Sequence, residues 1–115
     1  MPEYKVLLYE EGGRYPVQDF LRGLPKQAKE KADKWIDLLY EKGNEMPSKY
    51  CSKLTGSPLW ELKIDYRKNE YRVFYFFSGK LIILVHGFIK KTNHTPQSEI
   101  ELGEKRMRIY EKGRT

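Results

Sequence analysis

LWELKIDYRKNEYRVFYFFSGKLIILVHGFIKK, residues 59–91, is the stretch that decides the fold. It contains three runs rich in β-branched and aromatic residues, separated by a polar turn at Arg67 to Glu70 and by the dipeptide Ser78-Gly79. This pattern is typical of three consecutive antiparallel strands joined by tight turns. We therefore expect a β-meander over this segment.

The turn at Ser78-Gly79 predicts the register of the second hairpin, because a two-residue loop sets Phe77 opposite Lys80. Side chains alternate between the faces of a sheet, so Arg72 would share one face with apolar residues and one distant cation. These are Phe74, Phe76, Leu81, Ile83, Val85, Ile89 and Lys91. The same register places His86 on the opposite, helix-packed face, where a hydrogen-bonded core histidine is expected.

In the first hairpin, a four-residue loop from Arg67 to Glu70 would pair Tyr66 with Tyr71. The alternate residues of the first strand then join the face of Arg72: Glu61, Lys63 and Asp65. The residues between them, Trp60, Leu62 and Ile64, would point together toward the core. The meander is therefore expected to have one charged face and one apolar face.

The rest of the chain adds a strand and helices to the meander. Residues 4–9 form a short apolar run, and helices are expected from Pro16 and over 25–42, where apolar residues recur at helical spacing. Residues 45–58 contain Pro and Gly and should be irregular, and Thr95 can cap a last helix that begins at Pro96. The element order β-α-α-β-β-β-α predicts an α+β fold, a twisted antiparallel sheet with helices packed mainly on one face. At 115 residues, we expect a single domain over 1–115.

The composition of the chain indicates the cellular compartment in which the protein is expected. Cys51 is the one cysteine, so an internal disulfide is impossible and a reducing compartment is natural. No apolar run reaches the length of a membrane span, and the N-terminus lacks the pattern of a signal peptide. We therefore expect a cytoplasmic protein without membrane contact.

The net charge of +6 lies around the meander. Residues 48–92 contain nine basic and three acidic residues, which leaves thirteen of each elsewhere (22 − 9 and 16 − 3). Such an excess is typical of a surface that meets phosphates, although lysines that protect sheet edges and keep the protein soluble would produce the same count. The lysines at 26, 29, 31 and 34 are interleaved with acidic residues, which favours a solvated helix face.

The charged face of the meander is the candidate site. Two histidines and one cysteine at unrelated spacing cannot supply a typical zinc site, and neither a glycine-rich phosphate loop nor a nucleophilic triad is present, so we expect no metal and no cofactor. A cluster of Lys63, Arg72 and Lys91 fits cleavage of a phosphodiester by an adjacent 2′-hydroxyl. Lys63 is the candidate base, because nearby cations favour its neutral amine, and Arg72 can grip the phosphate bidentately. A binding site without catalysis would use the same residues, and pairing of Arg72 with Asp65 across the strands is a further alternative.

Three motifs, LWEL, YRVFY and HGFIKKT followed by TP and EIE, closely resemble the HigB-like branch of the RelE/HigB toxins. These are bacterial and phage-related, ribosome-dependent mRNA endoribonucleases of type II toxin–antitoxin systems. The resemblance extends from Tyr4 to the last helix. It implies that Lys63 is the catalytic lysine, that Arg72 binds the phosphate, and that the basic residues after the third strand are Lys90 and Lys91. His94 replaces a lysine that relatives commonly carry before the Thr-Pro pair, and it is a candidate general acid.

Other residues are candidates for contact with RNA. Lys49 and Lys53 precede the meander, whereas tyrosines near the first turn can stack on bases. With the cations of that turn, the full set of candidate RNA contacts is Lys49, Lys53, Tyr66, Arg67, Lys68 and Tyr71.

The resemblance implies cleavage of mRNA in the ribosomal A site and neutralisation by a cognate helix-turn-helix antitoxin. Two alternatives keep the fold and lose RNA cleavage. One is a ParE-like protein that poisons gyrase, in which Lys63 and Arg72 are surface charge. The other is a non-catalytic module that binds RNA or an antitoxin.

Overall fold

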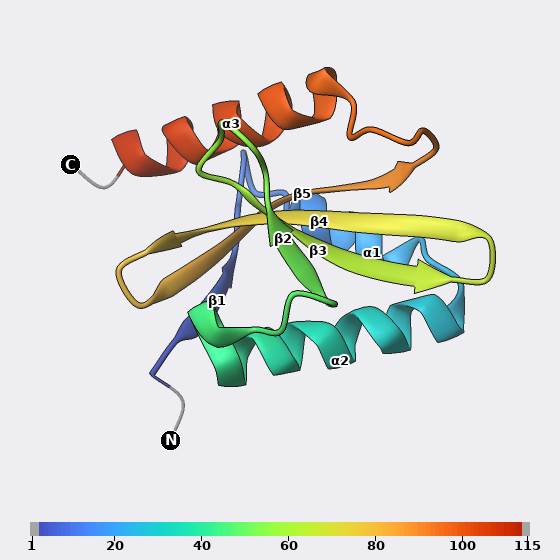
Figure 1. The fold of residues 1–115 in the computed structure, drawn as a ribbon. Helices are drawn as coiled ribbons and strands as arrows, with labels where there is room; N and C mark the ends of the chain where they lie inside the picture. The colour runs from blue at the N-terminus through green and yellow to red at the C-terminus, as the bar shows by residue number, and fades with distance from the viewer. Residues whose placement is uncertain (1–2, 114–115) are drawn as a thin grey trace.

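The computed structural model describes residues 3–113, and a mixed sheet of five strands forms its middle layer (Figure 1). The strand order is β1-β5-β4-β3-β2, with β3 (Trp60–Tyr66), β4 (Asn69–Ser78) and β5 (Leu81–Lys90) as the predicted meander. β1 (Lys5–Leu8) lies at one edge, as expected, but it pairs with β5 in parallel, so the sheet is not wholly antiparallel. The α+β class is confirmed.

The opposite edge of the sheet is a strand that the sequence did not predict. β2 (Cys51–Lys53) lies in the stretch that was expected to be irregular, and it pairs antiparallel with β3. Three residues with a single apolar side chain are too short for an alternating pattern to be recognised. β2 therefore depends on the neighbouring β3 for its existence.

Helices cover both faces of the sheet, which corrects the expectation of helices mainly on one face (Figure 1). α1 (Pro16–Arg22) and α2 (Lys26–Lys42), followed by a short 3₁₀ turn (Gly43–Glu45), pack on one face. α3 (Gln97–Lys112) packs on the other. No helix among residues 3–113 is long and apolar enough to cross a membrane.

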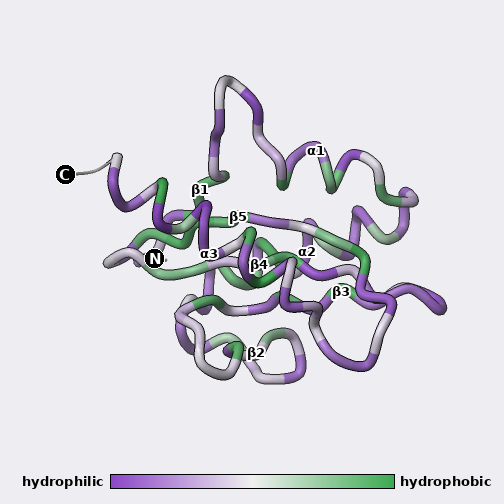
Figure 2. Tube along the Cα trace, turned by 90° about the horizontal axis from the view of Figure 1, so that it is seen from above, coloured by the Kyte–Doolittle hydropathy of each residue, from purple (hydrophilic) through white to green (hydrophobic). Residues whose placement is uncertain are grey.

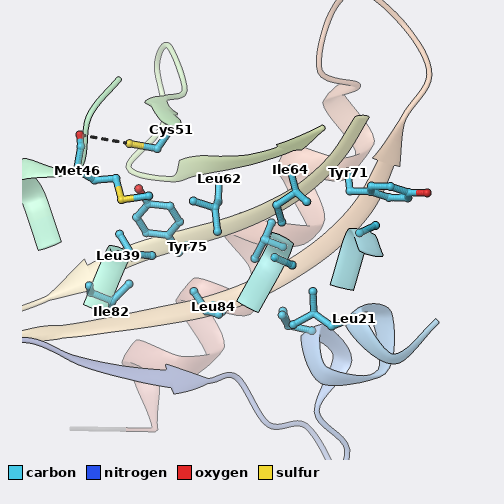
Figure 3. Packing of buried hydrophobic residues seen from close by; sticks show 14 residues of the cluster. Leu21, Leu39, Met46, Cys51, Leu62, Ile64, Tyr71, Tyr75, Ile82 and Leu84 are labelled. Atoms are coloured by element: carbon cyan, nitrogen blue, oxygen red, sulfur yellow. Dashed lines mark hydrogen bonds between the residues drawn. The ribbon is translucent and has the colours of Figure 1, made fainter. Parts of the chain in front are cut away.

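The two faces bury two separate cores. The larger core, between the sheet and α1 and α2, includes Leu62, Ile64, Tyr71 and Leu84 (Figure 3). Trp60 packs against this core, as predicted, although it is only half-buried. The smaller core lies under α3 and is formed by Tyr9, Leu54, Leu59, Phe74, Phe76, Ile83, Val85 and Phe88. In Figure 2 the hydrophobic stretches gather along the sheet, whereas the loops and α3 are mainly hydrophilic.

Both hairpin turns differ from the predicted registers. Tyr66 pairs with Asn69, so the first loop has two residues rather than four, and Arg67 in it adopts φ 56°. Ser78 pairs with Leu81, so the second loop is Gly79-Lys80, with φ 60° at glycine. In each case the pairing shifts by two residues, which preserves the faces because side chains alternate with period two.

A β-bulge in β5 changes the faces beyond it. Tyr75 pairs with Leu84 and Phe74 with His86, so Val85 is the extra residue. The predicted placement of His86 beside Leu84 is therefore wrong, and so is the placement of Ile89 and Lys91 on the face of Arg72. His86 and Phe88 lie on that face, toward α3, whereas Ile89 pairs with Tyr71.

Candidate functional site

A cleft of about 600 Å³ opens on the α3 side of the sheet, where β3 and β4 meet the loop before α3. Its lining includes five cationic side chains and two acidic ones, which leaves an excess of three positive charges (5 − 2). The cations come from the β2 region, from the meander and from the end of β5: Lys49, Lys53, Lys63, Arg72 and Lys90. His94 and Thr95 of the loop before α3 complete the polar wall. The cleft brings together most of the predicted site residues.

Lys63 and Arg72 lie directly opposite each other on β3 and β4. Their shared face agrees with the prediction, although the loop length on which it was based is wrong. Lys63 is half-buried and its side chain lines the cleft, while its backbone N–H donates to Tyr50 O at 2.8 Å. The backbone of Lys63 is therefore held in place in the sheet, and its side chain lies in the open cleft.

Arg72 is buried and surrounded by carboxylates. Its Nε donates to Glu61 Oε1 at 2.8 Å, Nη1 to Asp65 Oδ1 at 2.7 Å, and Nη2 to Glu70 Oε1 at 2.7 Å. Nη1 also donates to the carbonyl of Tyr71 at 3.1 Å. The pairing of Arg72 with Asp65 across the strands is thus present, together with two further carboxylates.

The three carboxylates differ in burial. The Glu61 side chain is 6% exposed, whereas those of Asp65 and Glu70 are 59% and 48% exposed. Glu61 also accepts a hydrogen bond through Oε2 from Thr95 Oγ1 at 3.1 Å. Glu61 is therefore the buried partner of Arg72, while the other two carboxylates are accessible to solvent.

The loop between β5 and α3 places the residues that follow the meander. His94 is exposed on the wall of the cleft, and its carbonyl accepts a hydrogen bond from Thr92 Oγ1. Thr95 bonds to Glu61 and makes no capping bond to α3, whose N-cap is Pro96. Lys90 lines the cleft, whereas Lys91 is exposed and is not part of its lining.

The predicted RNA contacts at the first turn lie apart from the cleft. Tyr71 is 3% exposed and packs its ring against Phe20 of α1, so it is a core residue and cannot stack on a base. The Tyr66 hydroxyl bonds with Gln27 of α2, and Arg67 lies over the Tyr66 ring at 5.3 Å. Arg67 and Lys68 are exposed at the tip of the hairpin.

Lys49 and Lys53, the predicted phosphate contacts before the meander, both line the cleft. Lys53 Nζ donates to the carbonyl of Ser57 at 2.6 Å, and Lys49 Nζ lies 5.0 Å from the centre of the Tyr50 ring. β2 and the segment before it position these two amines. The unpredicted edge strand therefore forms part of the site.

A polar network beside the cleft fastens α3 to the sheet. His86 Nε2 lies 2.6 Å from Glu99 Oε1, and Arg106 Nη1 lies 3.2 Å from His86 Nδ1 and donates to the carbonyl of Val85 at 2.9 Å. Because arginine can only donate, His86 Nδ1 accepts and Nε2 carries the proton. Burial lowers the pKa of His86, and Arg106 acts in the same direction, against the opposing effect of Glu99. The hydrogen-bonded core histidine is confirmed, on the face opposite to the predicted one.

Sequence reasoning gave Asp65 as a partner of Arg72 but missed Glu61 and Glu70 in that role, and it missed the polar residues of the cleft wall. Glu70 was placed in a turn, and Asn93, Ser52 and Thr95 were not predicted to line the cleft. One signal in the sequence could have predicted the carboxylate partners: Glu61, Lys63 and Asp65 alternate along one strand, and Arg72 lies on the next. Opposite charges on adjacent strands commonly pair. Among residues 3–113, no three His, Cys, Asp or Glu side chains are grouped so as to hold a metal ion.

Comparison with known proteins identifies the family of this chain. The family model described as "Phage derived protein Gp49-like (DUF891)" matches residues 19–108, which include the end of α1, all of α2, the whole meander and most of α3. A search of curated proteins found no match. The Gp49-like family is associated with toxins of toxin–antitoxin systems, and such a toxin implies an antitoxin partner. The chain therefore belongs to the Gp49-like family of phage-derived proteins, within the RelE/HigB-type toxin superfamily.

Proposed function

We propose that this protein is a toxin that cleaves mRNA in the ribosomal A site by attack of a 2′-hydroxyl on the adjacent phosphate. The observation that carries the proposal is the cationic cleft, in which Lys63 lies opposite Arg72 and beside Lys90 and His94. The reaction needs a base at the 2′-hydroxyl, positive charge around the phosphorane and an acid at the leaving 5′-oxygen. The cleft contains a candidate for each role.

Lys63 is the proposed base, because its amine lines the cleft on a rigid strand. Lys90, with Lys49 and Lys53 of the same cleft lining, supplies the positive charge that a phosphorane requires. His94 is the proposed acid, since an imidazole can donate a proton to a leaving group and the loop holds this one at the cleft. Lys91 is a weaker candidate for stabilising the phosphorane, because it lies outside the cleft lining.

Arg72 can reach a phosphate only by exchanging partners. Its Nη2 donates to Glu70, which is half-exposed near a hairpin turn, whereas its Nε is held by buried Glu61. A phosphate that displaces the Glu70 carboxylate would occupy the Nη edge while Glu61 keeps the guanidinium in place. Glu70 and Asp65 then hold Arg72 in its functional orientation until RNA binds.

A second candidate function follows from the same observation. Because carboxylates already occupy Arg72 on three sides, a module that binds RNA or its antitoxin without cleavage would need only the lysines of the cleft. In that case Arg72 has a structural role.

Single-turnover cleavage of mRNA on programmed ribosomes tests the two functions. Wild-type protein should cut the message in the A site, and the product should carry the 2′,3′-cyclic phosphate that 2′-hydroxyl attack produces. A folded protein that binds ribosomes without cutting would support the binding module. Co-expression with a neighbouring helix-turn-helix protein should suppress toxicity if that protein is the antitoxin.

A further inference from the structure

The lysines at the start of α2 lie in two different environments. Lys29 forms an ion pair with Asp33, at 2.9 Å, and lines a groove toward α1 and β1. Lys31 and Lys34 instead line a hollow of about 330 Å³ together with the ring of Trp35. The sequence favoured one solvated face for all of these lysines, whereas the structure places two of them beside a half-buried tryptophan ring that lines a hollow.

Trp35 belongs to a row of two adjacent aromatic rings with a lysine at each end. Its ring centre lies 4.4 Å from that of Tyr50, and both residues are half-buried. Lys31 Nζ lies 6.0 Å from the Trp35 ring at one end, and Lys49 Nζ lies 5.0 Å from the Tyr50 ring at the other. We call Lys31, Trp35, Tyr50 and Lys49 the aromatic row.

The aromatic row is continuous with the cleft around the open edge of β3. Lys49 belongs to both, because it also lines the cleft. The carbonyl of Tyr50 accepts the backbone N–H of Lys63, and Lys31 Nζ donates to the carbonyl of Asp65. A polymer that leaves the cleft over this edge would meet the aromatic row next.

We propose that the aromatic row binds a nucleotide of single-stranded RNA that lies outside the cleft, with its base against Trp35 and Tyr50 and a phosphate near Lys34. The inference rests on the proposed ribonuclease function and extends it to the course of the RNA. Stacking on aromatic rings next to cations is the usual way to hold single strands without reading their sequence. Paired bases are enclosed in a duplex, so a double strand would not fit this surface in the same way.

The charge of the hollow agrees with this assignment. Lys31 and Lys34 face one carboxylate, Glu30, so the hollow keeps a net positive charge of one (2 − 1). A phosphate can bind there, and the neighbouring aromatic rings favour a nucleotide over an acidic protein segment, because the nucleotide has a base that stacks on them. The row should therefore contribute both stacking and a modest dependence on salt.

RNA oligonucleotides of increasing length, fully 2′-O-methylated so that no attacking hydroxyl remains, test the proposal. Wild-type affinity should increase in a step once the strand is long enough to extend from the cleft to the aromatic row. A Trp35→Leu, Tyr50→Leu variant should lose this step and bind the longer strands about tenfold or more weakly, as when a stacked base loses its aromatic partner. Tyr40→Leu, which removes an exposed ring elsewhere on α2, is the matched control and should bind as wild type does.

Two further measurements do not depend on the stability of the double variant. In a Trp60→Phe background, which leaves Trp35 as the sole tryptophan, long RNA should quench the emission and short RNA should not. Lys34→Gln should lower the slope of log affinity against log salt by about one, whereas Lys42→Gln, at the far end of α2, should not.

Equal affinities of the wild type and the folded double variant at every RNA length would overturn the proposal, and so would RNA binding without quenching. Weaker binding of the antitoxin with unchanged RNA affinity would also overturn it, because the surface would then serve a protein partner. Failure of the proposed ribonuclease function can be distinguished from failure of this inference. Methylated RNA measures binding alone, so the aromatic row can be tested even in a protein that cleaves no RNA.

Discussion

Replacing Arg72 by methionine should lower the free energy of unfolding by about 3–5 kcal/mol, the cost of leaving one member of a buried ion pair without its partner. The structural reason is Glu61, whose side chain is 6% exposed and whose Oε1 lies 2.8 Å from Arg72 Nε. Asp65 and Glu70 are about half-exposed, so the loss of each of those pairs should cost only about 0.2–1 kcal/mol. Most of the penalty therefore comes from one carboxylate.

Urea unfolding of four proteins checks this magnitude: wild type, Arg72→Met, Glu61→Gln and the double variant. A neutral amide at position 61 removes the buried charge, so the double variant should regain much of the stability that Arg72→Met loses. Asp65→Asn serves as the control for an exposed pair and should change stability by less than about 1 kcal/mol. Equal stabilities of Arg72→Met and wild type would refute the reasoning.

The same proteins separate the structural and catalytic roles of Arg72. If Arg72 donates to the phosphorane, the stabilised double variant should still cleave about 10²–10³-fold more slowly than Glu61→Gln alone, as when one preorganised donor is lost. If the two cleave equally well, Arg72 serves only to hold the strands together. Arg72→Lys keeps the charge without the planar fork and should recover part of the activity.

Three more predictions concern single residues. Lys63→Ala should reduce the rate of single-turnover cleavage by about 10²–10⁴-fold with an unchanged melting temperature. Lys105→Ala, at an exposed position of α3, is the control and should leave the rate unaltered. A fully active Lys63→Ala protein would exclude Lys63 as the base. Burial holds the pKa of His86 below 6.5, whereas histidine in the unfolded chain has a pKa near that value, so the free energy of unfolding should decrease as the pH falls below 6.5. Urea unfolding at a series of pH values measures this dependence, and His86→Gln should remove the part that comes from His86. Gly87→Ala would place Cβ 2.3 Å from the ring of Phe20 and should cost about 1–3 kcal/mol in the same assay, whereas unchanged stability would show that α1 repacks freely.

The sequence determined those features that depend on local pattern. Apolar periodicity identified the meander and α2 with only small errors at their ends, because hydrophobic spacing reflects which side of an element is buried. Alternation placed Glu61, Lys63, Asp65 and Arg72 on one face, since an error of two residues in loop length leaves the faces unchanged. The motifs that resemble the RelE/HigB toxins lie largely within the part of the chain that matches the Gp49-like family.

Only the tertiary structure decided the features that depend on distant partners. The bulge at Val85 leaves a carbonyl that accepts a hydrogen bond from Arg106, which is 21 residues further along the chain. The same bulge turns His86 toward α3, and it is Lys90 rather than Lys91 that lines the cleft. β2 exists because β3 offers an edge, and Arg72 is enclosed because two carboxylates of β3 and one of β4 converge on it. The spacing of hydrophobic residues indicates which residues are buried. The pairing register and the partners of buried charges depend on the free energy of the whole folded chain, which no local sequence pattern contains.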